Sequence, residues 1–469
     1  MIRIIQLFSY SVILLFCYSV CVTAQIQVAP DRYRIEFTDK NNSSFSIDKP
    51  QLFLSEKALQ RRAKHGFAVT DADMPVSAVY IDSLKKMGFD VMNCSRWFNS
   101  AILRSSPEEI EKLDGLSFIK HNRIIKNELE QVGIIDTVLI IEGDKQKFAL
   151  EYEKAPDYYG MAAEQIGMLK GHLLHERGFR GQGIFIAVID GGFYNVNELS
   201  GFDSLHISGR LKGFKNFTHD IGNPLGNNNH GTNVLSILAA CIPDTLIGSA
   251  PEADYLLLRS EETEHEYLVE EDNWIAAAEY ADSIGVDMIS SSLGYSRFDD
   301  ATQNHTHEEL DGRTIRVSRA ATMAAARGIL VCISAGNSGI AGLKSITAPA
   351  DADSIITVGA VNRQGTYANF SSCGPTADNR TKPELVAVGS RTAYQNSMGA
   401  VLRGNGTSYS TPLLAGIIAC FWQANPDKTN MQIIEAIKKS ASHFDAPDHF
   451  YGYGIPDFGK LIETTETSQ

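Results

Sequence analysis

The alternation of short apolar runs with helical patterns over residues 166–461 restricts the fold of this chain more than any other feature. The apolar runs are interpreted as strands at 184–190, 253–260, 286–294, 328–336 and 354–361. Helical spacing occupies the segments 230–242, 274–285 and 318–328. Strands that are apolar at every position are typical of a parallel sheet covered by helices on both faces. We therefore expect an α/β fold, a three-layer sandwich with a mostly parallel central sheet.

The rest of the chain divides by pattern into smaller parts. Residues 25–126 alternate short strands with helices, which is typical of a small α+β domain. Residues 127–160 mix short apolar runs with charges and are interpreted as a connector. The large α/β unit is expected to occupy residues 161–463, followed by a short polar tail at 464–469.

Residues 1–24 have the layout of a secretory signal peptide. An arginine precedes an apolar run from Leu7 to Val22, and small residues stand before Gln25. An uncleaved membrane anchor is the main alternative, because the apolar run is long for such a signal. A lipoprotein signal fits less well, since neither Cys17 nor Cys21 follows the small residues that it requires. We expect a secreted or periplasmic protein.

Charge and cysteine content argue against a nucleic acid-binding protein and against a disulfide-rich protein. The formal net charge is −14, and an acidic surface repels nucleic acid phosphates, so we expect no nucleic acid partner. Five cysteines lie beyond the signal, an odd number without a C-x-x-C pair, so no disulfide framework is indicated. Cys332 and Cys420 lie in apolar segments and are expected to be buried thiols. We expect a monomer.

Four polar residues stand at the ends of predicted strands or the starts of predicted helices. Asp190 ends the strand 184–190, and His230 opens a long apolar helix after a run of asparagines. Ser408 stands at the mouth of an apolar helix, in GNGTSYSTP, and Asn337 follows a strand in SAGNSG. Each residue alone has a commonplace reading as a turn or helix-cap residue. Together they are expected at one edge of one sheet, where ligands gather.

The chain resembles the subtilisin-like (S8) serine peptidases in these same segments. The matching motifs are AVIDGG at Asp190, HGTNV at His230, SSSLG at 290–294, SAGNSG at Asn337 and GTSYSTP at Ser408. They occur in the family's order, Asp then His then Ser. The resemblance covers about 290 residues, from 166 to 461, and implies a subtilisin-like fold for the α/β unit.

The resemblance implies a role for each of these residues. Ser408 would be the nucleophile, His230 the general base and Asp190 the residue that orients the histidine. The Asn337 side chain and the Ser408 backbone N–H would hold the oxyanion. The substrate would add as a strand beside Ser292, Leu293 and Gly294 and contact Ala335 and Gly336.

The sequence also departs from the family's pattern. Gly191 stands where Ser or Thr is frequent, Asn233 replaces a frequent second histidine, and Ser410 stands where Ala is common. Many family members carry a calcium loop after the histidine helix, and here that segment, 241–251, is short. The chemistry requires no cofactor, structural calcium is not supported, and we name no metal ligand. The acidic, histidine-containing insertion at 296–318 is interpreted as a solvated loop rather than a metal site.

By the same resemblance, residues 25–126 would be an inhibitory prodomain that also assists folding, with processing in the connector. The protein would then be a zymogen of a secreted serine endopeptidase that acts on polypeptides. One alternative is a catalytically silent binding protein of the same fold, although no triad residue is missing. An esterase of the α/β-hydrolase type is disfavoured, because Ser408 lies in no G-x-S-x-G elbow.

Overall fold

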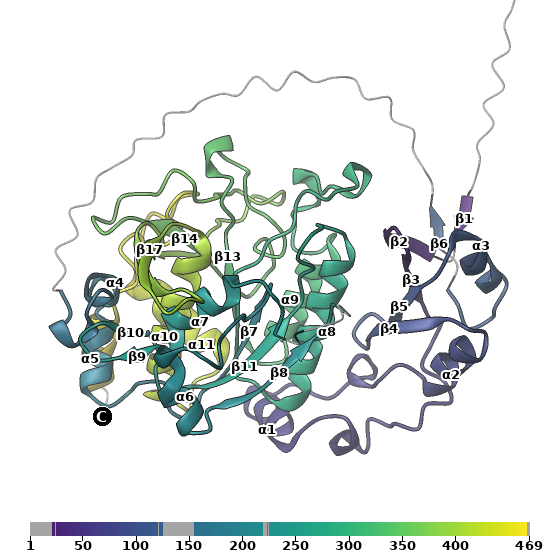
Figure 1. The fold of residues 1–469 in the computed structure, drawn as a ribbon, viewed down its shortest axis with the longest axis horizontal. Coiled ribbons are helices and arrows are strands. Elements are labelled where there is room, and N and C mark those ends of the chain that lie inside the picture. The colour runs from purple at the N-terminus through teal and green to yellow at the C-terminus, as the bar shows by residue number, and fades with distance from the viewer. Residues whose placement is uncertain are drawn as a thin grey trace, which may run out of the picture.

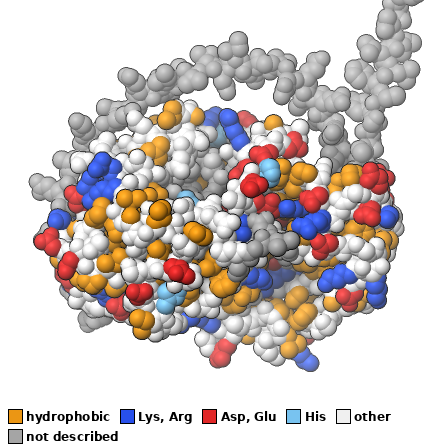
Figure 2. All heavy atoms as spheres, viewed as in Figure 1, with side chains coloured by type: hydrophobic (Ala, Val, Ile, Leu, Met, Phe, Trp, Pro, Cys, Tyr) orange, Lys and Arg blue, Asp and Glu red, His pale blue; other side chains and the backbone are white. Residues whose placement is uncertain are grey.

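The computed structural model describes residues 21–23, 25–120, 122–124, 154–218, 223 and 225–466. The predicted signal peptide, apart from residues 21–23, and the predicted connector, apart from residues 154–160, lie outside the described residues. Within the described part of the chain, no helix is long and apolar enough to cross a membrane. On the face shown in Figure 2, acidic and basic side chains are interspersed, and neither sign forms a continuous surface.

A seven-stranded sheet forms the centre of the larger domain, in the order β15-β14-β13-β12-β7-β11-β8 (Figure 1). Every neighbouring pair in it is parallel, which confirms the predicted sheet. The strands are β7 (Phe185–Asp190), β8 (Leu211–Asn216), β11 (Asp254–Arg259), β12 (Met288–Ser291), β13 (Leu330–Ser334), β14 (Ile356–Val361) and β15 (Leu385–Val388). The apolar runs identified in the sequence supply all of these strands except β8 and β15.

Side chains of the sheet alternate between two cores, one on each face. In β7, Ile186 and Val188 pack into one core, whereas Ala187 and Ile189 pack into the other. The first face is covered by α4 (Ala163–Met168), α5 (Gly171–Glu176), α7 (His230–Ala239), α10 (Thr407–Gln423), α11 (Asn430–Ser440) and α12 (Phe458–Glu466). The second face is covered by α8 (Val269–Ile284) and α9 (Arg316–Ala325). This is the three-layer arrangement expected from the sequence.

Shorter elements complete the larger domain. They are α6 (Asp203–Ile207) and the hairpins β9 (Cys241–Ile242) with β10 (Leu246–Ile247) and β16 (Thr392–Gln395) with β17 (Val401–Gly404). Ala155 and Tyr159, from the segment assigned to the connector, pack into the core on the α10 face. Cys332 and Cys420 are buried free thiols, as predicted.

The N-terminal domain is a four-stranded antiparallel sheet with short helices, which confirms the predicted α+β unit. Its strands follow the order β2-β3-β5-β4. They are β2 (Gln25–Ala29), β3 (Arg32–Glu36), β5 (Ser100–Arg104) and β4 (Asp90–Ser95), and the helices are α1 (Glu56–His65), α2 (Ala78–Lys86) and α3 (Pro107–Ile110). A short strand, β6 (Asn122–Ile124), lies at the end of this domain. It pairs with β1 (Cys21–Thr23) and not with the four-stranded sheet.

The N-terminal domain packs against α8 of the larger domain (Figure 1). β4 lies along α8, and α1 lies at the end of that helix, where Ser55 N–H donates to the Ser283 carbonyl over 2.8 Å. A small apolar cluster joins the domains as well, since Val28, Ala29 and Ile102 pack with Val269. The contact therefore includes both the sheet and a helix of the smaller domain.

Buried acids of α8 anchor this contact. The fully buried Asp282 carboxylate accepts from three arginines of the N-terminal domain, at 2.5 Å from Arg61, 2.7 Å from Arg62 and 2.6 Å from Arg96. Glu279 accepts from the Ser95 hydroxyl at 2.5 Å and from the Arg96 backbone N–H at 2.8 Å. Since each buried charge has a partner from the other domain, separating the domains exposes or unpairs these groups.

Candidate functional site

One edge of the central sheet carries the polar residues that the sequence singled out. Asp190 is the last residue of β7, and His230 is the first residue of α7. Asn337 follows β13, and Ser408 lies in the first turn of α10. Parallel strands all end at the same edge, so consecutive strand–helix junctions bring their side chains together there. The long, buried α10 holds Ser408, which is 8% exposed, in a rigid frame.

Asp190 and His230 form a close pair. Asp190 Oδ1 lies 2.7 Å from His230 Nδ1 and also accepts the Gly191 backbone N–H at 2.8 Å. Asp190 is fully buried, and its charge raises the pKa of His230 above the ordinary value, against the effect of burial. The backbone N–H of His230 donates to Asn228 Oδ1 at 2.8 Å. Since Nδ1 faces Asp190, Nε2 is the ring atom available for proton transfer.

Asn337 is held beside Ser408 through Thr407. The Asn337 Oδ1 atom accepts from the Thr407 backbone N–H at 2.9 Å and from its hydroxyl at 3.1 Å. Its amide oxygen is therefore fixed, and the NH₂ group remains to donate elsewhere. A Cβ atom added at Gly406 would lie 2.8 Å from Ser408 Oγ and 3.9 Å from Asn337 Nδ2. The Ser408 hydroxyl and the Asn337 amide thus border the same small space. A side chain at position 406 would enter this space, and glycine leaves it open.

A cavity of about 630 Å³ extends from His230 and Asn337 along the sheet edge. The segment after β12 lines it with Ser292, Leu293 and Gly294, and Gly336 lines it from the segment after β13. The Ser292 hydroxyl also donates to the Ser408 carbonyl at 3.0 Å and so connects this segment to the start of α10. Ala335 is buried, with its N–H bonded to the Val358 carbonyl at 3.0 Å, and its contact with substrate stays a prediction.

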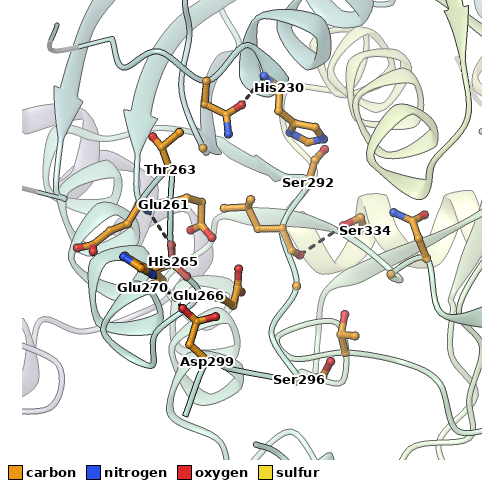
Figure 3. Close-up of a pocket in the computed structure, with 18 of the residues that line it drawn as sticks. His230, Glu261, Thr263, His265, Glu266, Glu270, Ser292, Ser296, Asp299 and Ser334 are labelled. Carbon is orange, nitrogen blue, oxygen red and sulfur yellow. Dashed lines mark hydrogen bonds and ion pairs between the residues drawn. The ribbon is translucent and has the colours of Figure 1, made fainter. Parts of the chain in front are cut away.

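Acidic side chains line the same cavity and were missed in the sequence. Glu261, Glu266, Glu270 and Asp299, here called the acidic wall, lie on one side of it, and His230 and Ser292 lie on the other (Figure 3). Glu261 follows β11, and Glu270 lies in the first turn of α8. The acid-rich run 261–272 was the available signal, but such runs usually lie on a solvated face.

Three of these carboxylates lie close enough together to bind a cation. The ligand atoms of Glu261, Glu266 and Glu270 lie within 4.8 Å of one another. From the sequence we predicted no metal ligand among these residues, and we considered a metal site only in the insertion at 296–318. The prediction that this insertion is a solvated loop is wrong at His305. His305 is 11% exposed, and its Nε2 lies 2.5 Å from Glu271 Oε1, because the loop folds back onto α8.

Several curated proteins are similar to this chain. Serine protease AprX of Bacillus subtilis is 31% identical over 304 residues, which are 58% of this chain and 65% of AprX. Subtilisin E of the same species is 28% identical over 320 residues, covering 66% of this chain and 72% of that protein. The crystal structure of MycP1 from Mycobacterium smegmatis is 21% identical, with a TM-score of 0.49, and covers 66% of this chain and 88% of that one.

Two family models match the chain, one for each domain. The model described as the peptidase S8 propeptide domain of Bacteroidota matches residues 32–136. The model described as the subtilase family of peptidases S8 matches residues 181–454 and includes Asp190, His230, Asn337 and Ser408. The second match covers more than half of the chain and contains the whole edge of the sheet described above. The chain therefore belongs to the subtilase family.

Proposed function

We propose that this protein is a secreted serine endopeptidase made as a zymogen, with Ser408, His230 and Asp190 as its catalytic triad. The observation that carries the proposal is the 2.7 Å contact between Asp190 and His230, at the sheet edge where α10 presents Ser408 beside Asn337. Membership of the subtilase family and the similarity to named serine proteases support the same reaction class. The substrates are polypeptides.

The geometry supports acyl transfer in two steps. Ser408 Oγ attacks the scissile carbonyl carbon while His230 Nε2 accepts its proton. The carbonyl oxygen becomes an oxyanion that accepts from Asn337 Nδ2 and from the Ser408 backbone N–H. His230 then protonates the leaving amine, and an acyl-enzyme remains. Water, deprotonated by the same histidine, then attacks the acyl carbon, and His230 returns the proton to Ser408 Oγ as the new carboxyl product leaves. Asp190 stabilises the imidazolium in both steps and stays ionised.

The N-terminal domain is proposed to act as an inhibitory and folding-assisting prodomain. The propeptide family match supports this role, as do the buried ion pairs between Asp282 and its three arginines. We place the processing site in the connector 127–160, most of which lies outside the described residues. N-terminal sequencing of the mature protein tests this placement, which a start well outside 127–160 would contradict. Secretion through residues 1–24 belongs to the same proposal.

Peptide hydrolysis by matched serine variants tests the activity. Full-length protein is incubated with a mixed peptide library, and new termini are identified by mass spectrometry. We expect cleavage by the wild type and none by Ser408→Ala. Ser410→Ala is the matched control, because the Ser410 hydroxyl is buried and donates to the Thr407 carbonyl over 3.0 Å. A wild type that cleaves nothing after removal of the N-terminal domain would favour the silent binding protein instead.

A further inference from the structure

The acidic wall of the cavity is more negative than peptide hydrolysis requires. Glu261, Glu266, Glu270 and Asp299 face the space that His230 and Asn337 border, yet none of them takes part in the proposed chemistry. Each carboxylate repels the others, so grouping them in a partly closed cavity costs free energy unless a positive group offsets their charge. This arrangement calls for a cationic occupant.

Glu270 gives an independent sign of a missing partner. Its side chain is fully buried and lines the cavity. Oε1 accepts the Glu262 backbone N–H at 2.7 Å, but Oε2 is buried without a hydrogen-bond partner. Buried carboxylate oxygens without a donor are rare, because the lost hydration is not replaced. A donor that enters the cavity would satisfy this oxygen.

The titration of the wall agrees with this geometry. Burial raises the pKa of Glu270, and the neighbouring Glu261 and Glu266 raise it further. Burial also raises the pKa of Glu261, and burial with the Asp299 charge raises that of Glu266 to about 7. Without an occupant, the wall therefore holds protons near neutral pH. A cation would let the carboxylates ionise and bind it.

An arginine of the N-terminal domain already binds at the rim of this wall. Arg32, on β3, forms an ion pair with Glu262, which is adjacent to Glu261 and also lines the cavity. The Arg32 side chain is only 13% exposed, so the guanidinium lies in a largely enclosed position. The rim thus accepts the kind of group that a basic peptide would bring. Removal of the N-terminal domain would free Glu262 as a further acceptor.

A peptide side chain suits the wall better than a divalent ion does. Calcium takes six to eight oxygen ligands. Here the Ser260 and Tyr295 hydroxyls, each at 2.7 Å, already donate to Glu261 Oε1, and Glu262 N–H occupies Glu270 Oε1. The wall also faces the cavity from one side only, towards the segment Ser292–Gly294 (Figure 3). Guanidinium and ammonium groups, which carry several donors, match an open row of carboxylates.

We propose that the acidic wall is a specificity subsite that takes an arginine or lysine side chain of the polypeptide substrate. This proposal rests on the proposed peptidase function and names its substrate class. Glu270 and Glu266 are the residues that bind the basic group, and the Glu261 carboxylate adds its charge within 4.8 Å of theirs. They determine which peptides are cleaved and take no part in bond breaking.

Matched peptides that differ in one charge test the subsite. Each peptide carries either arginine or citrulline, its neutral near-isostere, at one position from four residues before the cleaved bond to two after it. The concentration of active enzyme comes from labelling with a fluorophosphonate. We expect kcat/KM to favour arginine by about 10- to 100-fold at one position, the range for a hydrogen bond to a charged group. Glu270→Gln and the less buried Glu266→Gln should each lower this ratio by about 10-fold.

Control measurements separate this proposal from its alternatives. Glu435 lies on α11, is paired there with Lys439 and does not line the cavity, so Glu435→Gln should leave the ratio unchanged. If the protein cleaves peptides and takes the label but shows no preference for arginine at any position, the subsite proposal is contradicted and the peptidase function is retained. Calcium chloride that raises the melting temperature of the wild type but not of Glu270→Gln would overturn it in favour of a metal site. Absence of both cleavage and labelling would remove the proposed function itself.

Discussion

Asp190 Oδ1 lies 2.7 Å from His230 Nδ1, and the aspartate is fully buried while the histidine side chain is 33% exposed to the cavity. The pair thus joins a shielded negative charge to a ring that substrate can reach. The aspartate stabilises the protonated imidazole, and this raises the pKa of His230. In the proposed mechanism, the pair sets the pH range in which His230 can act as a base.

The pH profile should report this pair. His230 must be neutral to accept the Ser408 proton, so kcat/KM should rise with pH through the pKa of His230, and that pKa should lie above the ordinary 6.5. Asp190→Asn removes the charge, so the rising limb should move to lower pH while kcat falls by about 10⁴-fold. Rates of peptide cleavage, or of phosphonate labelling for the slow variant, measure both effects. An unmoved limb in Asp190→Asn would contradict the assignment.

Asn337 should contribute through its amide donor. In Asn337→Asp the side-chain oxygen can still accept from Thr407, but the NH₂ group is lost. We expect kcat to fall by about 10²–10³-fold with KM little changed, the loss measured when such a donor was removed from a subtilisin. Steady-state kinetics with one peptide provide the measurement. A proportional rise in KM at constant kcat would instead indicate a role in binding the substrate ground state.

Asp282 should hold the two domains together. Burial alone would raise the pKa of its carboxyl, but Arg96, Arg61 and Arg62 keep it below its ordinary value. Asp282→Asn removes the anion that three buried guanidiniums share, and of these Arg62 keeps Asp73 as a partner at 3.1 Å. We therefore expect the full-length protein to lose about 3–5 kcal/mol of stability. Urea unfolding measures this loss. Asp157→Asn, in a pair with Lys154 whose aspartate side chain is 95% exposed, should change stability by less than about 1 kcal/mol. Equal effects of the two variants would contradict the role of Asp282.

The same network of ion pairs predicts that the contact between the domains is destabilised at low pH. Burial opposes ionisation of Asp73, but Arg327 and Arg62 lower its pKa to about 2. A carboxyl with a lowered pKa stabilises the fold above its unfolded pKa and loses that contribution as pH falls through the folded value. Above about pH 4, Asp73 should therefore contribute the same stability at every pH. As the pH falls from there towards pH 2, the full-length protein should lose this contribution and its melting temperature should fall. Melting curves across this range measure it, and stability that rises on acidification would contradict the sign.

The sequence predicted the central sheet because its buried strands are apolar at every position. The polar ends of those strands also predicted where Asp190, His230 and Asn337 would lie. The sequence did not predict β8, an edge strand without a buried residue in which lysines interrupt the apolar residues, or β15, which has only four residues. Neither strand carries a long apolar run, so periodicity gave no signal.

Long-range contacts explain what else the sequence did not predict. The acids at 261–272 were not singled out from the sequence, yet Glu270 and Glu271 are buried, because the start of α8 lies between the cavity, the insertion and the N-terminal domain. His305 likewise has a buried carboxylate as its partner, from a segment 34 residues away. Burial of a charged residue depends on such tertiary partners, which local pattern does not reveal.

Site mapping with a fluorophosphonate tests the central claim most directly. The full-length protein and its processed form are treated with the probe, digested and sequenced by mass spectrometry, beside His230→Ala and Ser408→Ala. We expect a single phosphonate adduct on Ser408 in the wild type, strongly reduced labelling in His230→Ala and none in Ser408→Ala. An adduct on another serine, or a wild type whose processed form takes no label, would contradict the assignment of Asp190, His230 and Ser408 as the triad.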